Sequence, residues 1–203
     1  MNLGSSTLVV EPLLTGSVTT TADGNLVLAT VTSIRSRARH ILVDTGGFNQ
    51  QLALQQRLEP LPPVTSIIVT HFHWDHCANL RLFPGIPVYA MTEPKWFDRA
   101  TLGDVQLIPT MVSVHEGDTV DGLANIWEVP GHTANHVAVA VLGDHGRVLI
   151  TGDAISDTTD AAQGAPHLAF YSEMEARRQV GRLLTAADWI IPGHGAPFEV
   201  FHA

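Results

Sequence analysis

Three histidines and one aspartate stand within six consecutive residues, and together these side chains could hold metal ions. The run reads His71-Phe72-His73-Trp74-Asp75-His76. In an extended segment, side chains two residues apart point the same way, so His71 and His73 could bind one cation together. Asp75 and His76 follow the turn and could face a second cation, because imidazole nitrogens and carboxylate oxygens suit zinc and neighbouring metals. An exposed, inert histidine-rich loop is the alternative, but such ligand clusters are rare outside metal sites.

Four ligands are too few for two tetrahedral ions, so other segments must contribute. His132, Asp153 and His194 each stand next to a glycine and directly after a predicted strand. Small neighbours let the backbone approach an ion closely. A single histidine at a strand end is usually structural, so the prediction depends on the shared placement of all three.

The elements that must position these side chains follow from hydrophobic periodicity and β-branched runs. Strands are predicted over residues 27–34, 40–43, 64–70, 86–90, 124–129, 137–142, 147–151 and 189–191. Helices are predicted over 49–58, 76–82 and 172–186, and a Ser172…Glu175 capping box opens the last. Four strands end in short turns that hold Asp44, His71, Asp153 or His194. Strands that converge on such turns, with helices outside them, predict a layered α/β domain with its site at one edge.

Composition narrows the class of protein. The 203 residues show no internal linker, so we expect a single domain over 1–203. A net charge of −9 with 11 Lys and Arg disfavours a nucleic-acid partner. We expect no membrane partner, because no apolar run approaches 18 residues, and no signal peptide, because the N-terminus lacks a basic cluster before an apolar run. The single cysteine, Cys77, excludes an intrachain disulfide. A cytoplasmic protein with a small-molecule substrate is the expectation, and a homodimer is compatible with it.

The order and spacing of these motifs resemble those of the metallo-β-lactamase superfamily. The resemblance covers about residues 26–197 and extends to Asp44 in Val43-Asp44-Thr45-Gly46. It implies a four-layer αββα sandwich with the site at the edge between the two sheets. Carried over position by position, it assigns His71, His73 and His132 to one metal, Asp75, His76 and His194 to a second, and Asp153 to both. Asp44 would then orient one of the ligands, a role that metal-binding histidines need.

The resemblance also implies a chemistry. Two divalent ions, zinc first with iron or manganese as alternatives, would share a water and lower its pKa toward 7. The resulting hydroxide would attack an acyl carbon or a phosphorus, and Asp75 is the catalytic residue suggested as proton acceptor. The predicted function is therefore hydrolysis of an ester, thioester, lactone or β-lactam-like bond. A Ser-His-Asp hydrolase lacks support, because no Gly-x-Ser-x-Gly motif occurs.

Departures from known branches of the superfamily leave several alternatives open. Glyoxalase II members carry a C-terminal glutathione-binding region, whereas this chain ends nine residues after His194. Homoserine lactonases have a tyrosine where Ser156 stands, which weakens that assignment. Residues 75–85 and 192–198 resemble a branch for which RNA cleavage is implied, so a metal-dependent phosphodiesterase or RNA nuclease is an alternative.

Three further alternatives come from other classes. A mononuclear iron dioxygenase acting on persulfides would use His71, His132 and Asp153 and leave the second metal position empty. A flavodiiron-type module would need a carboxylate where His73 stands. A non-catalytic, metal-stabilised binding domain would keep all seven ligands without turnover.

Other residues carry less specific signals. Cys77 is expected in the core, and His136 could line the site or be structural. Trp74, Trp96 and Phe97 could form an apolar wall, although the core is the usual place for aromatic side chains. Residues 156–171 show no clear period, and a loop of that length is often a lid or a binding loop, so specificity residues are expected there.

Overall fold

The computed structural model describes residues 8–22, 24–91, 110–144 and 146–202. Its first sheet has six strands in the order β1-β4-β5-β6-β7-β8. Their bounds are β1 Val9–Leu14, β4 Val31–Arg35, β5 His40–Val43, β6 Ser66–Ile68, β7 Val88–Ala90 and β8 Met111–Ser113. The strands from β5 to β8 run parallel, so the carboxyl ends of β5 and β6 lie at one edge of the sheet.

The second sheet also has six strands, in the order β14-β13-β12-β11-β10-β9. Their bounds are β9 Thr119–Val120, β10 Ala124–Glu128, β11 Val137–Gly143, β12 Gly146–Gly152, β13 Trp189–Pro192 and β14 Phe198–Glu199. Strands β12 and β13 are parallel, and their carboxyl ends come before Asp153 and His194.

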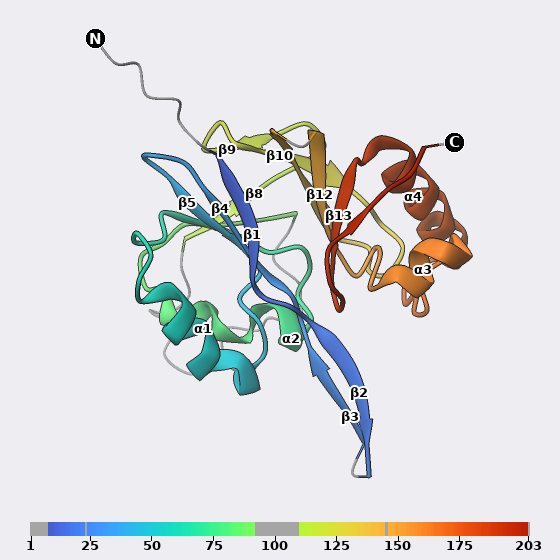
Figure 1. Ribbon diagram of the computed structural model, residues 1–203, viewed down its shortest axis with the longest axis horizontal. Helices are drawn as coiled ribbons and strands as arrows, with labels where there is room; N and C mark the ends of the chain where they lie inside the picture. The colour runs from blue at the N-terminus through green and yellow to red at the C-terminus, as the bar shows by residue number, and fades with distance from the viewer. Residues whose placement is uncertain (1–7, 23, 92–109, 145, 203) are drawn as a thin grey trace.

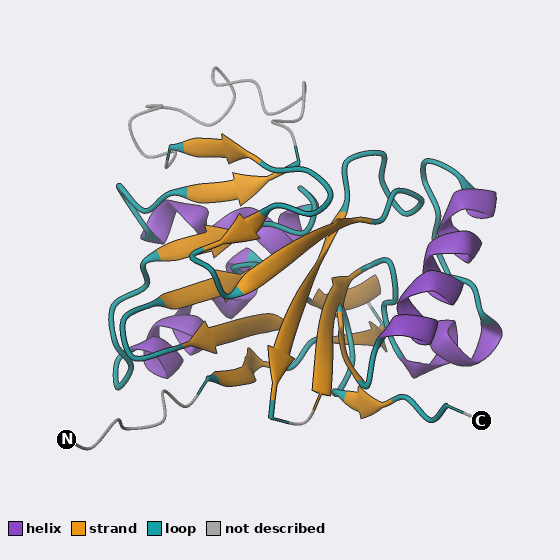
Figure 2. Ribbon diagram, turned by 90° about the horizontal axis from the view of Figure 1, so that it is seen from above, coloured by secondary structure: helices purple, strands orange, loops and turns teal. Residues whose placement is uncertain are grey.

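The two sheets face each other, with helices on both outer sides (Figures 1 and 2). Apolar side chains of β4, β5 and β6 meet those of β10, β11, β12 and β13 in a buried layer between the sheets. The helical segments of the first half are η1 Phe48–Gln50, α1 Gln51–Leu58, α2 Trp74–Cys77 and η2 Ala78–Leu82, and those of the second half are α3 Thr158–Gln163 and α4 Glu173–Ala186. Two further apolar clusters attach these helices to the outer faces. The result is the predicted four-layer αββα sandwich.

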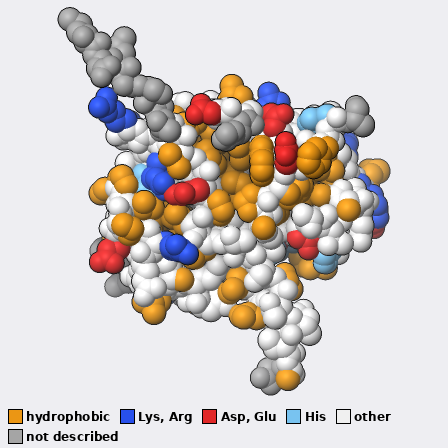
Figure 3. Space-filling model, viewed as in Figure 1, with side chains coloured by type: hydrophobic (Ala, Val, Ile, Leu, Met, Phe, Trp, Pro, Cys, Tyr) orange, Lys and Arg blue, Asp and Glu red, His pale blue; other side chains and the backbone are white. Residues whose placement is uncertain are grey.

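A separate two-stranded hairpin, β2 Ser17–Thr21 and β3 Gly24–Leu28, projects from the body (Figure 1). Its visible face carries uncharged polar and apolar side chains (Figure 3). The base of the hairpin is tightly packed, because a Cβ on Gly16 would lie 2.5 Å from the carbonyl oxygen of Gly193. The hairpin base therefore lies directly against the segment that carries His194.

Most predicted elements are present, and two predictions need correction. The strand predicted over 27–34 is two strands, β3 and β4, because Ala29 pairs with the Gln50 side chain and the Thr30 N–H donates to Gly193 O. The stretch 156–171, predicted to lack regular structure, contains α3. Asp157 caps that helix by accepting from the N–H groups of Thr159 and Asp160, and Gly164 ends it in a left-handed conformation.

Elements without a long period were missed, namely β1, β2, β8, β9 and β14. Ser172 caps α4 as predicted, accepting from the Glu175 N–H, but the Glu175 carboxylate pairs with Arg178. No helix among the described residues is long and apolar enough to cross a membrane.

Candidate metal centre

The seven predicted ligands all lie at the edge where the carboxyl ends of the central strands of both sheets meet. His71, His73, Asp75 and His76 follow β6, and the last two belong to α2. His132 follows β10, Asp153 follows β12 and His194 follows β13. The ends of strands from both sheets thus bring side chains to one place from segments far apart in the sequence.

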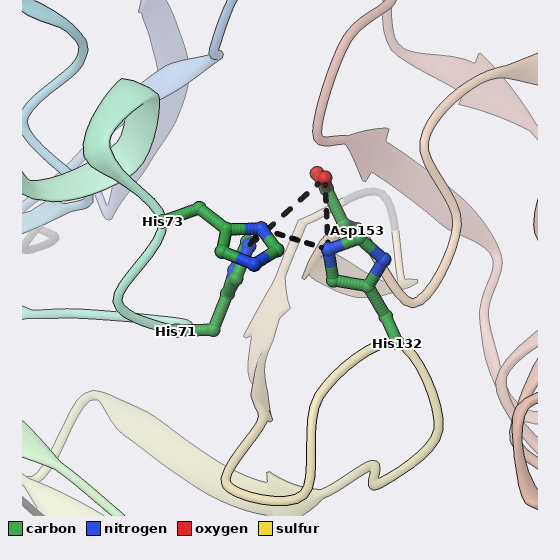
Figure 4. A group of neighbouring side chains, drawn as sticks. All are labelled: His71, His73, His132 and Asp153. Carbon is green, nitrogen blue, oxygen red and sulfur yellow. Dashed lines mark hydrogen bonds and ion pairs between the residues drawn. The ribbon is translucent and has the colours of Figure 1, made fainter. Parts of the chain in front are cut away.

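Four of the seven form the first group. The ligand atoms of His71, His73, His132 and Asp153 all lie within 4.8 Å of one another. His73 Nδ1 is 3.0 Å from both His71 Nε2 and His132 Nε2, and Asp153 Oδ2 is 3.4 Å from His132 Nε2. Figure 4 shows these side chains pointing toward one another from segments on opposite sides. Convergence of imidazole nitrogens and a carboxylate is the donor arrangement that zinc-like ions prefer.

The second group is formed by Asp75, His76 and His194, whose ligand atoms also lie within 4.8 Å of one another. Asp75 Oδ2 is 3.7 Å from His76 Nε2 and 3.5 Å from His194 Nε2. Asp153 joins the two groups. Its Oδ1 lies 3.1 Å from both His76 Nε2 and His194 Nε2, and its Oδ2 lies 3.2 Å from His194 Nε2 and 3.4 Å from His132 Nε2 in the first group. The arrangement provides two adjacent positions with one shared carboxylate.

Several of these histidines are oriented through the ring nitrogen that faces away from the centre. Asp44 Oδ2 lies 2.7 Å from His76 Nδ1. The carbonyl oxygens of Leu28 and Leu168 lie 2.9 Å from His194 Nδ1 and His132 Nδ1, respectively. Such contacts fix the ring orientation and the tautomer that leaves the other nitrogen free for an ion.

Asp44 is itself held in place. Its Oδ1 accepts from the Thr70 N–H at 2.8 Å, and its Oδ2 accepts from the Thr70 hydroxyl at 2.8 Å. The Asp44 backbone has φ +61°, a conformation that Asp tolerates better than most residues. The same Thr70 hydroxyl lies 3.1 Å from His71 Nδ1, so Asp44 and Thr70 connect both groups.

Two buried atoms at the junction point to an ion as the missing partner. His76 Nε2 and Asp153 Oδ1 are 3.1 Å apart, yet neither makes a hydrogen bond with any described residue. A buried polar atom without a partner is costly, and a carboxylate beside imidazole nitrogens satisfies a divalent cation. The residues present therefore fit a metal at each of the two positions.

Charge interactions shift the pKa values of the side chains at this junction. Burial opposes ionisation of Asp153, but His76 and His194 hold the pKa of its carboxyl well below the ordinary value. Burial alone would lower the pKa of His76, yet Asp153 and Asp44 outweigh burial and raise it well above the ordinary value. For His71, burial dominates and lowers the pKa, with His76 adding to the effect. Asp153 is therefore an ionised carboxylate within a shell of histidines.

Close packing around Asp153 leaves room only for glycine at Gly193. A Cβ there would stand 2.2 Å from Asp153 Oδ1 and 2.9 Å from the Gly152 carbonyl carbon. Gly195, on the other side of His194, would meet nothing closer than 3.4 Å. The glycine before His194 is thus required by the position of the shared carboxylate.

His136 was predicted either to line the site or to be structural, and the structure buries it completely behind the centre. Its ring stacks on His71, with 4.6 Å between centroids and an angle of 18°. Burial, with the nearby His132, lowers its pKa well below the ordinary value. A neutral imidazole therefore supports the back of His71.

Other predictions concern residues near the centre. Cys77 is buried in the core as expected, and burial raises the pKa of its thiol. Trp74 is 48% exposed, so it is not a core residue. Trp96 and Phe97 lie outside the described residues. The contacts made by the Leu28 and Leu168 carbonyls were missed, because a backbone group leaves no signal in the sequence.

Asp157, Asp160 and His167 also stand close together. Asp160 is buried and accepts from the N–H groups of Ser156 and His167, and Asp157 caps α3. Because these carboxylates are satisfied by donors of the protein, this cluster serves to anchor the 156–167 segment.

Comparison with known proteins agrees with the fold and the motifs. The family model described as "Metallo-beta-lactamase superfamily" matches residues 24–194, and the chain belongs to this superfamily. Members of the superfamily are metal-dependent hydrolases.

Individual relatives lie within the same superfamily. Metallo-beta-lactamase domain-containing protein 1 of Rattus norvegicus is 32% identical over 185 residues, which cover 88% of this chain and 69% of the relative. Hydroxyacylglutathione hydrolase of Methylobacterium nodulans is 39% identical over 79 residues, or 36% of this chain and 28% of the relative. The crystal structure of a putative metallo-beta-lactamase from Thermotoga maritima superposes with a TM-score of 0.75 at 21% identity, covering 95% of this chain and 99% of the other. The first relative represents the branch that residues 75–85 and 192–198 resemble.

Proposed function

We propose that this protein is a hydrolase that uses two divalent ions, zinc in the first instance, to cleave an ester, thioester, lactone or β-lactam-like bond. The observation that carries the proposal is the position of Asp153. Its Oδ1 lies 3.1 Å from both His76 and His194, while its Oδ2 reaches His132 of the first group at 3.4 Å and also lies 3.2 Å from His194. A shared carboxylate between two donor groups suits a pair of ions better than a single one.

When bound, a pair of divalent ions supplies an activated water and polarises the bond under attack. The protein's own groups then have separate tasks. His71, His73 and His132 would hold one ion, and Asp75, His76 and His194 the other. Asp44 orients His76 through their 2.7 Å contact, and thereby keeps Nε2 of that ring directed at the centre.

Asp75 is the proposed proton acceptor. Its side chain is about one quarter exposed, whereas those of His76 and Asp153 are buried. A carboxylate at the open side of the centre can take the proton of an attacking water and pass it to solvent. The local similarity to a hydroxyacylglutathione hydrolase supports an acyl substrate, and the net charge of −9 does not favour a polyanion.

The test compares Asp153→Asn with Asp144→Asn, which makes the same change at an exposed position away from the centre. Metal content is measured by elemental analysis, and turnover is measured on a thioester, a lactone, a β-lactam and a phosphodiester. We expect close to two ions per wild-type chain, and loss of metal with at least a hundredfold lower turnover for Asp153→Asn alone.

Three outcomes would contradict the proposal. One is wild-type turnover in Asp153→Asn. Another is a protein with two bound ions that turns over none of the acyl substrates. The third is one iron per chain with oxygen consumption on a persulfide, which would establish the dioxygenase alternative.

A further inference from the structure

One phenylalanine is exposed directly beside the candidate centre. Phe170 is 67% exposed, although large apolar side chains are usually buried. Its ring makes edge contacts with two of the candidate ligands, with centroids 5.5 Å from His73 and 5.3 Å from His132. A group that contacts the exposed face of Phe170 therefore lies next to the candidate metal ligands His73 and His132.

The backbone around Phe170 is fixed to the segment that carries His132. The Phe170 N–H donates to His132 O at 2.9 Å, and the Tyr171 N–H donates to Gly131 O at 3.2 Å. His132 Nδ1 contacts Leu168 O, so the same loop also orients the ligand ring. Upstream, Asp160 accepts from the His167 N–H at 2.8 Å. These hydrogen bonds hold residues 167–171 in place as a wall beside the centre, and they keep the Phe170 side chain exposed.

A pair of aromatic side chains stands on the Asp75 side of the centre. Phe48 and Trp74 stack with 6.0 Å between their centroids and an angle of 26°, and they are 58% and 48% exposed. Trp74 directly precedes Asp75, and a Cβ on Gly47 would lie 3.4 Å from the Asp75 Cα. This pair is therefore adjacent to the second group, as Phe170 is to the first.

We propose that Phe170 is a specificity residue that binds the apolar acyl group of the substrate, with the Phe48–Trp74 pair as the wall on the other side. The inference rests on the proposed hydrolase function and narrows the substrate class to esters or thioesters of medium-chain or aromatic acids. The Phe170 ring contacts two of the candidate ligands, so an apolar group bound against it belongs to the molecule that is cleaved. A longer acyl chain covers more of the exposed aromatic surface. Because removal of this surface from water is favourable, kcat/KM should rise as the acyl chain lengthens.

The experiment measures kcat/KM of the zinc-loaded protein for thioesters with acetyl, butanoyl, hexanoyl and octanoyl chains. A chain that lies against an apolar wall should gain up to about fourfold in kcat/KM for each added methylene. Phe170→Ala should reduce this gain, so that the octanoyl substrate loses at least tenfold more than the acetyl substrate. Phe170→Leu should restore part of the gain.

Phe201→Ala is the matched control. Phe201 is 85% exposed and follows β14, away from the candidate centre, so its removal should leave the gain per methylene unchanged. Metal content is measured for every variant. A flat chain-length profile in the wild type would overturn the inference, and so would an equal loss on all chain lengths in Phe170→Ala, which would indicate a purely structural role.

Failure of the proposed function is distinguishable from failure of this inference. If protein with two ions bound cleaves none of the thioester, lactone and β-lactam substrates, the hydrolase proposal fails, and the wall is then tested by binding of octanoate and acetate to the same protein. Tighter binding of octanoate that Phe170→Ala weakens and Phe201→Ala preserves would support the apolar site. Equal binding of the two carboxylates, or a dimer in sedimentation that Phe170→Ala dissociates, would overturn it.

Discussion

At the scale of single residues, the candidate centre depends on a glycine without a side chain as much as on its ligand side chains. Asp153 can place one oxygen toward each group of histidines only because Gly193 has no side chain. The carboxylate oxygen would otherwise meet a Cβ at 2.2 Å, well inside the shortest contact that real Cβ atoms make. The steric requirement of the site thus explains a glycine that the motif alone does not.

The first prediction follows from that contact. Gly193→Ala should displace the Asp153 carboxylate and lower zinc affinity at least tenfold, while Gly195→Ala, where the nearest atom is 3.4 Å away, should keep it. Competition with a chromogenic chelator measures both variants. Equal zinc affinity in the two variants would contradict the prediction, because it would show that Asp153 can shift without weakening zinc binding.

Asp44 allows a second prediction with a matched control. Asp44→Asn keeps a residue type that tolerates φ +61° but removes the charge beside His76, and should weaken metal binding by about 10- to 100-fold. Asp121→Asn makes the same change at φ +53°, at a carboxylate that accepts from Ser66. Isothermal titration with zinc compares the two. An equal loss of zinc affinity in Asp121→Asn would show that the effect does not depend on the contact between Asp44 and His76.

At the scale of elements, strand ends and their turns determine where the site forms. His40 opens β5 and connects it to its surroundings, with Nε2 2.9 Å from Ser33 Oγ on β4 and Nδ1 2.7 Å from Pro62 O. Burial lowers the pKa of His40, the Pro62 contact opposes this, and Arg35 adds to the lowering. The folded protein therefore favours the neutral ring at this position.

The third prediction concerns this histidine. Because its folded-state pKa is below the ordinary value of 6.5, the unfolded chain takes up the proton first as pH falls. The contribution of His40 to stability is complete above pH 6.5 and is lost as the pH falls toward the folded-state pKa. Urea unfolding of metal-free protein at pH 7.5 and 5.5 should show a smaller loss of stability in His40→Gln than in the wild type. An identical loss in both proteins would exclude His40 as a contributor.

Sequence reasoning succeeded where a side chain carries the signal and failed where the backbone does. The apolar runs before Asp44, His71, Asp153 and His194 predicted the central strands, because burial on both faces requires such runs. Helix α3 was missed, although Asp157 and Gly164 are ordinary capping residues, because its six residues are too few to show a period. The Leu28 and Leu168 carbonyls were not predictable, because any residue offers a carbonyl.

At the scale of the whole molecule, the ligands are divided between the two sheets. His71, His73, Asp75 and His76 come from the first half of the chain, while His132, Asp153 and His194 come from the second. Each of the two ions would therefore bridge both halves, and metal binding would stabilise the contact between the sheets.

The fourth prediction is that chelation lowers the stability of the whole protein. Zinc present at one hundred times its Kd should contribute about 2.7 kcal/mol per site to the free energy of unfolding, provided that the unfolded chain binds zinc weakly. Thermal unfolding with chelator, and again after zinc is restored, measures this difference. An unchanged midpoint would mean that metal does not bind across the sheets.

The division of the ligands also determines when the centre can form. The segments that carry them are far apart along the chain and are brought together as the apolar layer between the sheets packs. Contacts of such sequence separation form late, because loop closure precedes them. The second position needs Asp75 and His76 from the first half and His194 near the end of the chain, so it is completed only after β13 has paired with β12. Loading of metal would thus be a late step of folding, and it would select the chains in which both sheets have docked correctly.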